Sequence, residues 1–239
     1  MNKIVIFLGI FCGVIIVLWI AGRITGTLQY YKISTVANEP ALKRGEAVFT
    51  SNLKKPLLYK FITFTSKYED SIVAQGIQDF RRGSHYIYRV CGISGNTLQM
   101  KDGVLFVDGK NFDEELSLNT QYEISLKDFN TVVAEEDKTE DGSYRPVTDV
   151  KDSILTTFDQ AQVKKYQSRI KLIPFIFKDT GNVFKWLDKN STWTTDNFGP
   201  FTIPAGCYFV MGDNRHNALD SRYTGFIKAD YIKGVVLNK

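Results

Sequence analysis

The chain opens with a long apolar run. Residues 4–22 contain no charged side chain. At about 1.5 Å per residue in a helix this run spans roughly 28 Å, close to the thickness of the hydrocarbon core of a bilayer. Trp19 near its end and Arg23 just beyond it fit a membrane interface. We therefore expect an uncleaved transmembrane anchor over 4–22, after a short flank at 1–3, rather than a cleaved signal peptide.

From about residue 30 the pattern changes to short runs rich in Val, Ile, Phe and Tyr, which is typical of β-strands. We expect strands over 47–50, 57–65, 85–91, 98–101, 104–107 and 206–211. Two Asp-Gly pairs, Asp102-Gly103 and Asp108-Gly109, flank the run VLFV. Asp-Gly supplies the positive φ angles of a type I′ turn, so the first pair predicts a hairpin between 98–101 and 104–107.

Three later segments have other patterns. Residues 134–145 are polar and acidic, which predicts a solvated loop. Residues 149–170 carry apolar side chains at a helical spacing, which predicts a helix; these are Val150, Leu155, Phe158, Val163 and Tyr166. The apolar hexad 172–177 is expected in the core, with an exposed membrane-contacting loop as the alternative.

Composition excludes several classes of protein. Thirty Lys and Arg against 26 Asp and Glu leave a net charge of +4, and no basic run supports a nucleic-acid partner. Two His and three Cys are a poor basis for a zinc site or a disulfide scaffold. Cys91 and Cys207 could pair, but each lies in an apolar strand-like run, which favours buried free thiols. His216 lies in a polar segment, so we expect it to be solvated, and His85 has no evident chemical role.

Three stretches resemble, in order, the signature boxes of the type I signal peptidases, which are membrane-anchored serine proteases. Residues 33–46 (ISTVANEPALKRGE) are similar to the box S-x-S-M-x-P-T-L-x-x-G-D. Residues 86–97 resemble Y-I-K-R-V-x-G-x-P-G-D, and the hairpin KDGVLFVDGK resembles K-x-G-x-L-Y-V-N-G-K. Residues 208–225 resemble Y-F-x-M-G-D-N-R-x-x-S-x-D-S-R-x-x-G, a long and specific motif. The resemblance covers most of the chain outside roughly 112–195.

The resemblance implies a serine nucleophile, a lysine general base and a supporting hydroxyl, and this chain has none of the three. The nucleophile position falls on Ala37, the base on Tyr88 and the supporting hydroxyl on Ala218. A methyl group cannot attack a carbonyl, and a tyrosine with an ordinary pKa of about 10 is no evident base. The sequence therefore predicts a member of the family that lacks the catalytic dyad.

Other family features are retained. The resemblance implies that Arg89 and Asp213 form an ion pair between the second and third boxes, and that Asp220 and Arg222 form another within the third. Thr35 matches the hydroxyl that helps the backbone amide at position 37 bind an oxyanion, so Thr35 and Ala37 would line the peptide groove. No metal or organic cofactor is implied.

Three functional hypotheses stay open. The first is a non-catalytic protein that binds signal peptides or other extended peptides, or acts as an accessory to an active signal peptidase. The second is an active peptidase with a relocated nucleophile, for which Lys32 with Ser34 is the least implausible pair; the other serines considered are Ser84, Ser94 and Ser221. The third is a structural membrane protein whose groove is filled by Tyr88.

The expected architecture is mainly β: an amino-terminal transmembrane helix, an antiparallel β core over 30–111 and 196–239, and an inserted α+β cap over 112–195. Lys3 and the terminal amine precede the anchor and Arg23 and Lys32 follow it, so these charges do not orient the helix. The resemblance implies a single-pass protein of the bacterial inner membrane with its domain outside the cytoplasm.

Overall fold

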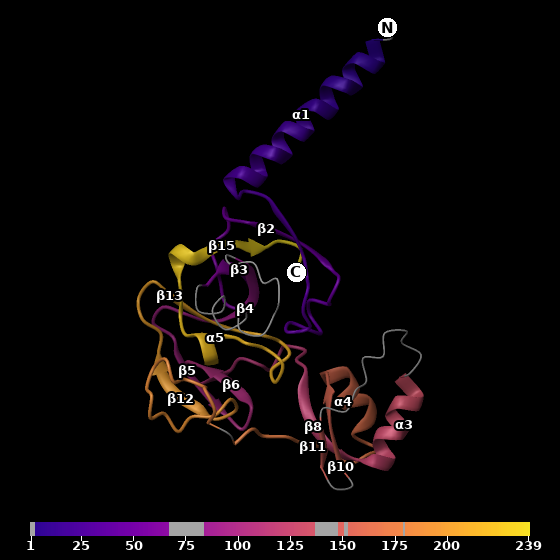
Figure 1. Ribbon diagram of the computed structural model, residues 1–239, viewed down its shortest axis with the longest axis vertical. Helices are drawn as coiled ribbons and strands as arrows, with labels where there is room; N and C mark the ends of the chain where they lie inside the picture. Colours follow the sequence, from indigo (N-terminus) through magenta and orange to yellow (C-terminus); the bar gives the residue numbers. More distant parts are fainter. Residues whose placement is uncertain (1–2, 67–83, 137–147, 151–152, 179) are drawn as a thin grey trace.

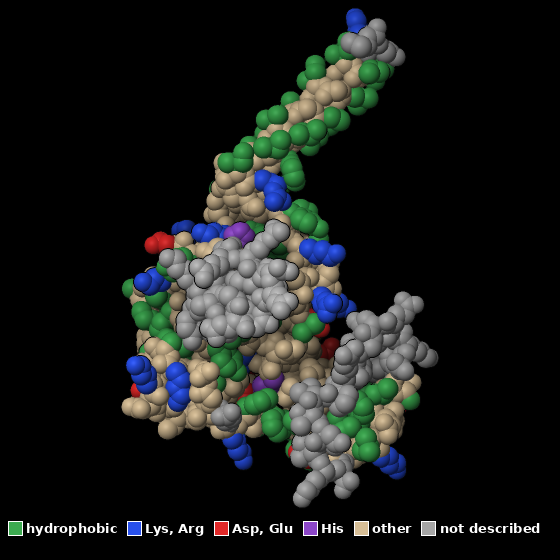
Figure 2. Space-filling view, in the orientation of Figure 1, with side chains coloured by type: hydrophobic (Ala, Val, Ile, Leu, Met, Phe, Trp, Pro, Cys, Tyr) green, Lys and Arg blue, Asp and Glu red, His purple; other side chains and the backbone are tan. Residues whose placement is uncertain are grey.

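The computed structural model describes residues 3–66, 84–136, 148–150, 153–178 and 180–239. Helix α1 (Lys3–Thr25) projects away from the rest of the molecule, with apolar side chains along its length (Figures 1 and 2). It is long and apolar enough to cross a membrane, and all of its side chains except Gly22 are exposed. Asn52 fixes the end of this helix, because its backbone N–H donates to Gly26 O and its side-chain amide donates to Thr25 O at 2.8 Å.

The largest sheet has seven strands in the order β1–β2–β15–β3–β4–β13–β14, and all neighbours are antiparallel. Its strands are β1 (Gln29–Lys32), β2 (Ala47–Ser51), β3 (Phe61–Thr65), β4 (His85–Ile93), β13 (Cys207–Met211), β14 (Ile227–Lys228) and β15 (Ile232–Val236). The short helices α5 (Ser221–Thr224) and η1 (Ala229–Tyr231) lie between β13 and β15 in the chain. The sheet thus places the second and third motif stretches on the neighbouring strands β4 and β13, while the first is the connection between β1 and β2.

A second antiparallel sheet has the order β12–β5–β6–β7. It is formed by β5 (Thr97–Lys101), β6 (Val104–Val107), β7 (Lys110–Asn111) and β12 (Phe198–Thr202). Asp102 and Gly103 have φ angles of 46° and 81°, so the expected type I′ hairpin between β5 and β6 is confirmed. Asp108 and Gly109 make a similar turn into β7.

A third sheet, β11–β8–β10–β9, packs with two helices beside the second sheet (Figure 1). Its elements are β8 (Thr120–Ser125), α3 (Leu126–Glu136), β9 (Thr148–Val150), β10 (Ser153–Phe158), α4 (Gln160–Tyr166) and β11 (Ile173–Pro174). It has its own apolar cluster, in which Ile124, Val132 and Phe158 are buried. The expected fold class, mainly β with an amino-terminal apolar helix and an α+β insertion, is confirmed.

Four local expectations are wrong. The helix over 149–170 is a strand up to Phe158, because Ile154, Thr156 and Thr157 are β-branched and the strand is buried on both faces. A helix begins only at Gln160, after the capping residue Asp159. Residues 134–136 of the expected loop end α3, and 137–145 lie outside the described residues.

The other two concern apolar runs that leave the core. The hexad 172–177 is partly exposed, and Ile173 is 41% exposed, because β11 is an edge strand of the third sheet. The strand expected from residue 57 begins only at Phe61, because Tyr59 has a φ of 70° and turns the chain.

Candidate functional site

The structure brings Ala37, Tyr88 and Ala218 together at one apolar cluster, which we call the site cluster. Ala37 and Tyr88 are both buried in it, and Ala218 packs against it. Its other buried members come from β3, β4, β13, β14 and β15; they are Ile62, Phe64, Val90, Val210, Ile227 and Val235. Apart from the Tyr88 hydroxyl, the side chains of the site cluster are hydrocarbon.

Gly212 sets the close approach of the first and third motif stretches. It follows β13 directly, and a Cβ built on it would lie 2.4 Å from Ala37 O and 2.5 Å from the Ala218 Cβ. Real Cβ atoms essentially never approach so closely, so only glycine fits between these two alanines. Packing against the Gly212 backbone therefore sets the positions of Ala37 and Ala218.

Tyr88 lies in the middle of β4, opposite Ile62 of β3. Its side chain is 7% exposed and its ring centroid lies 6.2 Å from that of Phe64. A large aromatic side chain therefore fills this part of the site cluster.

Two asparagines hold the loop that carries Ala37. The backbone N–H of Asn214 donates to Ala37 O at 3.0 Å, and its side-chain amide donates to Val36 O at 3.2 Å. From within the loop, Asn38 Nδ2 donates to Ile87 O of β4 at 2.7 Å. The loop is therefore tied both to the third motif stretch and to the strand that carries Tyr88.

Polar side chains that precede Ala37 in the chain are exposed. Ser34, Thr35 and Lys32 are all exposed, whereas Ala37 is buried. Neither Thr35 nor the Ala37 amide has a hydrogen bond among the described residues. A donor pair of this kind can bind a carbonyl oxygen without any proton transfer.

Arg89 and Asp213 lie together across the β4–β13 boundary. Arg89 Nε donates to Asp213 Oδ1 at 2.7 Å, and its Nη1 donates to Tyr59 O at 2.6 Å. The guanidinium also lies 4.1 Å from the centre of the Phe61 ring. Burial raises the pKa of Asp213, and the adjacent Arg89 opposes that shift.

Asp220 and Arg222 form a fully buried pair, each with 0% side-chain exposure. Asp220 accepts from Arg222 Nε at 2.9 Å and from Nη2 at 2.8 Å, and it also accepts the Gly212 N–H at 3.1 Å. Arg222 Nη2 further donates to Arg215 O. The pair therefore supports the glycine that separates Ala37 from Ala218.

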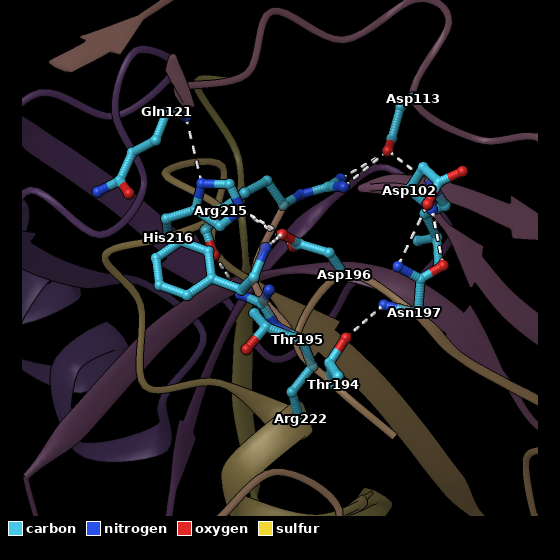
Figure 3. Close-up of polar contacts among 12 residues, drawn as sticks. Asp102, Asp113, Gln121, Thr194, Thr195, Asp196, Asn197, Arg215, His216 and Arg222 are labelled. Atoms are coloured by element: carbon cyan, nitrogen blue, oxygen red, sulfur yellow. Dashed lines mark hydrogen bonds and ion pairs between the residues drawn. The ribbon is translucent and has the colours of Figure 1, made fainter. Parts of the chain in front are cut away.

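Two polar contacts of the third motif stretch were not predicted from the sequence (Figure 3). Arg215 donates to both carboxylate oxygens of Asp113, with Nη1–Oδ2 at 2.7 Å. His216 is not solvated as expected: its side chain is 5% exposed, its Nε2 lies 3.0 Å from Asp196, and its Nδ1 accepts the Gln121 N–H. These pairs are separated by 20 to 102 residues, and no local pattern in the sequence links their members.

The remaining candidate residues have structural surroundings. Cys91 and Cys207 are free thiols, and burial raises the pKa of Cys91 to about 12. Ser221 Oγ accepts the Val210 N–H, and Ser94 Oγ donates to Cys207 O. No group of three or more His, Cys, Asp or Glu within the described residues could hold a metal ion.

His85 lies at the start of β4 and is exposed. Its ring centroid is 5.2 Å from that of Tyr31 in an edge contact. Partial burial, and after it the charge of Lys233, lower the pKa of His85.

Comparison with known proteins finds a matching family and similar relatives. The sequence profile of the family described as signal peptidase, peptidase S26, matches residues 4–238, which includes α1. "Signal peptidase I P" of Bacillus subtilis subsp. natto is 26% identical over 85% of this chain and 77% of its own length. "Signal peptidase I" of Bacillus licheniformis is 24% identical over 80% of this chain, and "Signal peptidase I T" of Bacillus subtilis strain 168 is 28% identical over 63%.

The chain spans 64% and 46% of the last two relatives' lengths. Among solved structures, a signal peptidase I from Enterococcus faecalis V583 is 20% identical, with a TM-score of 0.35, over 77% of this chain and 98% of that one. The profile match runs through the anchor, the site cluster and both ion pairs of the third motif stretch. The chain belongs to the signal peptidase family, peptidase S26.

Proposed function

We propose that this chain is a membrane-anchored, non-catalytic member of the signal peptidase family that binds extended peptides. The observation that carries this proposal is the site cluster, in which Ala37, Tyr88 and Ala218 replace a nucleophile, a base and a supporting hydroxyl with apolar contacts. Hydrolysis of a peptide needs an activated nucleophile, and none of the buried side chains of this cluster can be one.

A relocated nucleophile has little support. Ser34 and Lys32 are both exposed to water, and neither belongs to the buried site cluster. Ser221 is fully buried and already accepts a backbone N–H, and Ser94 lies in the turn after β4. Active proteolysis therefore remains the second candidate function, and a filled, purely structural groove is the third.

Peptide binding is favoured because backbone pairing needs no dyad. β3 pairs with β4 from His85 to Arg89, but β13 pairs with β4 only from Arg89 to Ile93. One side of the first half of β4 is therefore left without a partner strand among the described residues, next to the loop that carries Ala37. Signal peptides are the substrates that the family suggests, and an active signal peptidase is a further candidate partner.

The position in the cell is part of the same proposal. We place the β domain outside the cytoplasm, on a bacterial inner membrane, with α1 as the single span. The cap over 112–195 is proposed as an insertion into the core formed by 30–111 and 196–239.

The experiment that tests the loss of catalysis is cleavage of a preprotein by the purified full-length protein in detergent, beside an active signal peptidase. We expect no cleavage above background. Cleavage comparable to that of the active enzyme would refute the proposal, and its loss in the Ser34→Ala variant would then identify the nucleophile.

Restoration of the dyad gives the complementary test. The triple variant Ala37→Ser, Tyr88→Lys, Ala218→Ser returns a hydroxyl, an amine and a supporting hydroxyl to the site cluster. We expect it to gain cleavage, while the matched double variant that keeps Ala37 stays inactive. Equal activity of the two variants would show that position 37 is not the nucleophile site.

A further inference from the structure

The first half of β4 has one side whose backbone groups point away from β3. Val90 N–H donates to Lys60 O, and Val90 O accepts the Tyr59 N–H, so the backbone groups of Val90 point toward the β3 side. Backbone groups alternate along an antiparallel strand, so those of Tyr88 share that direction and those of Ile87 point to the opposite side. β13 pairs with this opposite side but ends at Met211, opposite Arg89.

Beyond the end of β13, the side chain of Asn38 lies beside Ile87 in place of a partner strand. Its Nδ2 donates to Ile87 O at 2.7 Å, as the N–H of a neighbouring strand would do. The orientation of the amide is settled by chemistry, because the opposite orientation would set two acceptor oxygens against each other. The side chain of Asn38, next to Ala37 in the chain, therefore takes a backbone acceptor on the open side of β4.

The other end of the same amide is unsatisfied. Among the described residues, Asn38 Oδ1 has no hydrogen-bond partner although it is buried, and the residue is only 3% exposed. A buried acceptor without a donor opposes the conformation that buries it. The Asn38 side chain thus makes one good hydrogen bond to Ile87 and buries one polar atom without a partner. The second effect offsets part of the first, so a peptide can displace the Asn38 amide from Ile87.

We propose that Asn38 competes with bound peptide for the Ile87 carbonyl and thereby sets the affinity of the site for extended polypeptide backbone. The inference rests on the proposed peptide-binding function and names a residue that limits it. An incoming strand must replace the Asn38 amide with one of its own N–H groups before it can pair with β4. Removal of the amide leaves the acceptor free, so binding becomes tighter.

The test is the affinity of a fluorescein-labelled decapeptide with Ala at alternate positions, measured by anisotropy with the full-length protein in detergent. Asn38→Leu keeps the size of the side chain and removes its donor. We expect the variant to bind about 3- to 10-fold more tightly, the gain from one net hydrogen bond. Asn217→Leu, an exposed residue of the third motif stretch, is the matched control and leaves the affinity unchanged.

A second peptide series identifies the bond itself. N-methylation of one backbone amide at a time removes one donor, and at one position it abolishes the gain of Asn38→Leu while it changes wild-type binding less. Asn38→Ser, too short to reach Ile87, gives the same pattern and covers the case in which the leucine variant does not fold.

The outcomes separate the two proposals. Wild-type binding with no gain in either variant overturns the competition and leaves peptide binding in place. A gain that no N-methylation removes also overturns it, because the gain then does not come from the Ile87 carbonyl. Absence of binding in the wild type and in both variants, each folded, overturns peptide binding and the competition together.

Discussion

The fully buried pair of Asp220 and Arg222 gives the sharpest prediction for stability. The change is Asp220→Ala. It leaves the Arg222 guanidinium buried with 0% exposure and without a carboxylate, and it removes the acceptor of the Gly212 N–H. Removal of one partner of a buried ion pair costs about 3–5 kcal/mol. For a domain of this size that corresponds to a fall in Tm of about 6–20 °C.

Tryptophan fluorescence of the full-length protein in detergent, followed during heating and in urea, measures the effect. Trp186 is a local reporter, because its indole N–H donates to Arg222 O at 3.2 Å. Asp230→Ala, at an exposed carboxylate, is the control and is expected to change stability by less than about 0.5 kcal/mol.

A double variant tests the reason as well as the size. Asp220→Ala with Arg222→Met removes both charges, and a buried pair replaced by apolar side chains is close to neutral. We therefore expect the double variant to be more stable than Asp220→Ala alone. A loss below about 1 kcal/mol in the single variant, or a double variant that is less stable than the single, would refute the reasoning.

Three further predictions follow from buried or strained groups. In the native protein at pH 8, a thiol reagent should modify Cys207 and spare Cys91, whose pKa is about 12 and whose side chain is buried; equal labelling by mass spectrometry would contradict this. Folding lowers the pKa of His85, so its contribution to stability is present above about pH 6.5 and is lost as the pH falls below that value. His85→Gln should therefore reduce the change in Tm between pH 7.5 and 5.5. An unchanged dependence of Tm on pH in the variant would count against this reasoning. Gly103→Ala should cost about 1–2 kcal/mol in urea unfolding because φ is 81° there, while Gly103→Asn costs less; equal losses would mean that backbone strain is not the cause.

Local chemistry explains which parts of the fold could be predicted from the sequence. The hairpin between β5 and β6 depends on Asp102-Gly103 alone, and the pattern of two residues is enough to specify its turn. The helix predicted over 149–170 was wrong up to Phe158, because Leu155 and Phe158 have a helical spacing within a strand that is buried on both faces. Periodicity cannot separate a fully buried strand from a helix.

The candidate site also contains residues that the sequence motifs indicate and contacts that only the tertiary fold reveals. Motif spacing singled out Ala37, Tyr88 and Ala218, and the structure places all three at one cluster, while their assignment as substituted catalytic positions stays a prediction. The contact of His216 with Asp196 could not be predicted, because both residues lie in polar segments and only the tertiary fold buries them. The contact of Asn38 with Ile87 was equally inaccessible, since one partner is a backbone carbonyl 49 residues away.

The fixed end of α1 has a consequence for how peptides would reach the site. Ala37 follows the last residue of the helix by twelve positions, so even a fully extended connection keeps it within about 40 Å of the membrane end of the anchor. A peptide that is itself held in the same bilayer would diffuse within that same thin aqueous layer. Encounter then becomes a search in two dimensions at a raised effective concentration, and an affinity that is weak in free solution is sufficient for occupancy at the membrane.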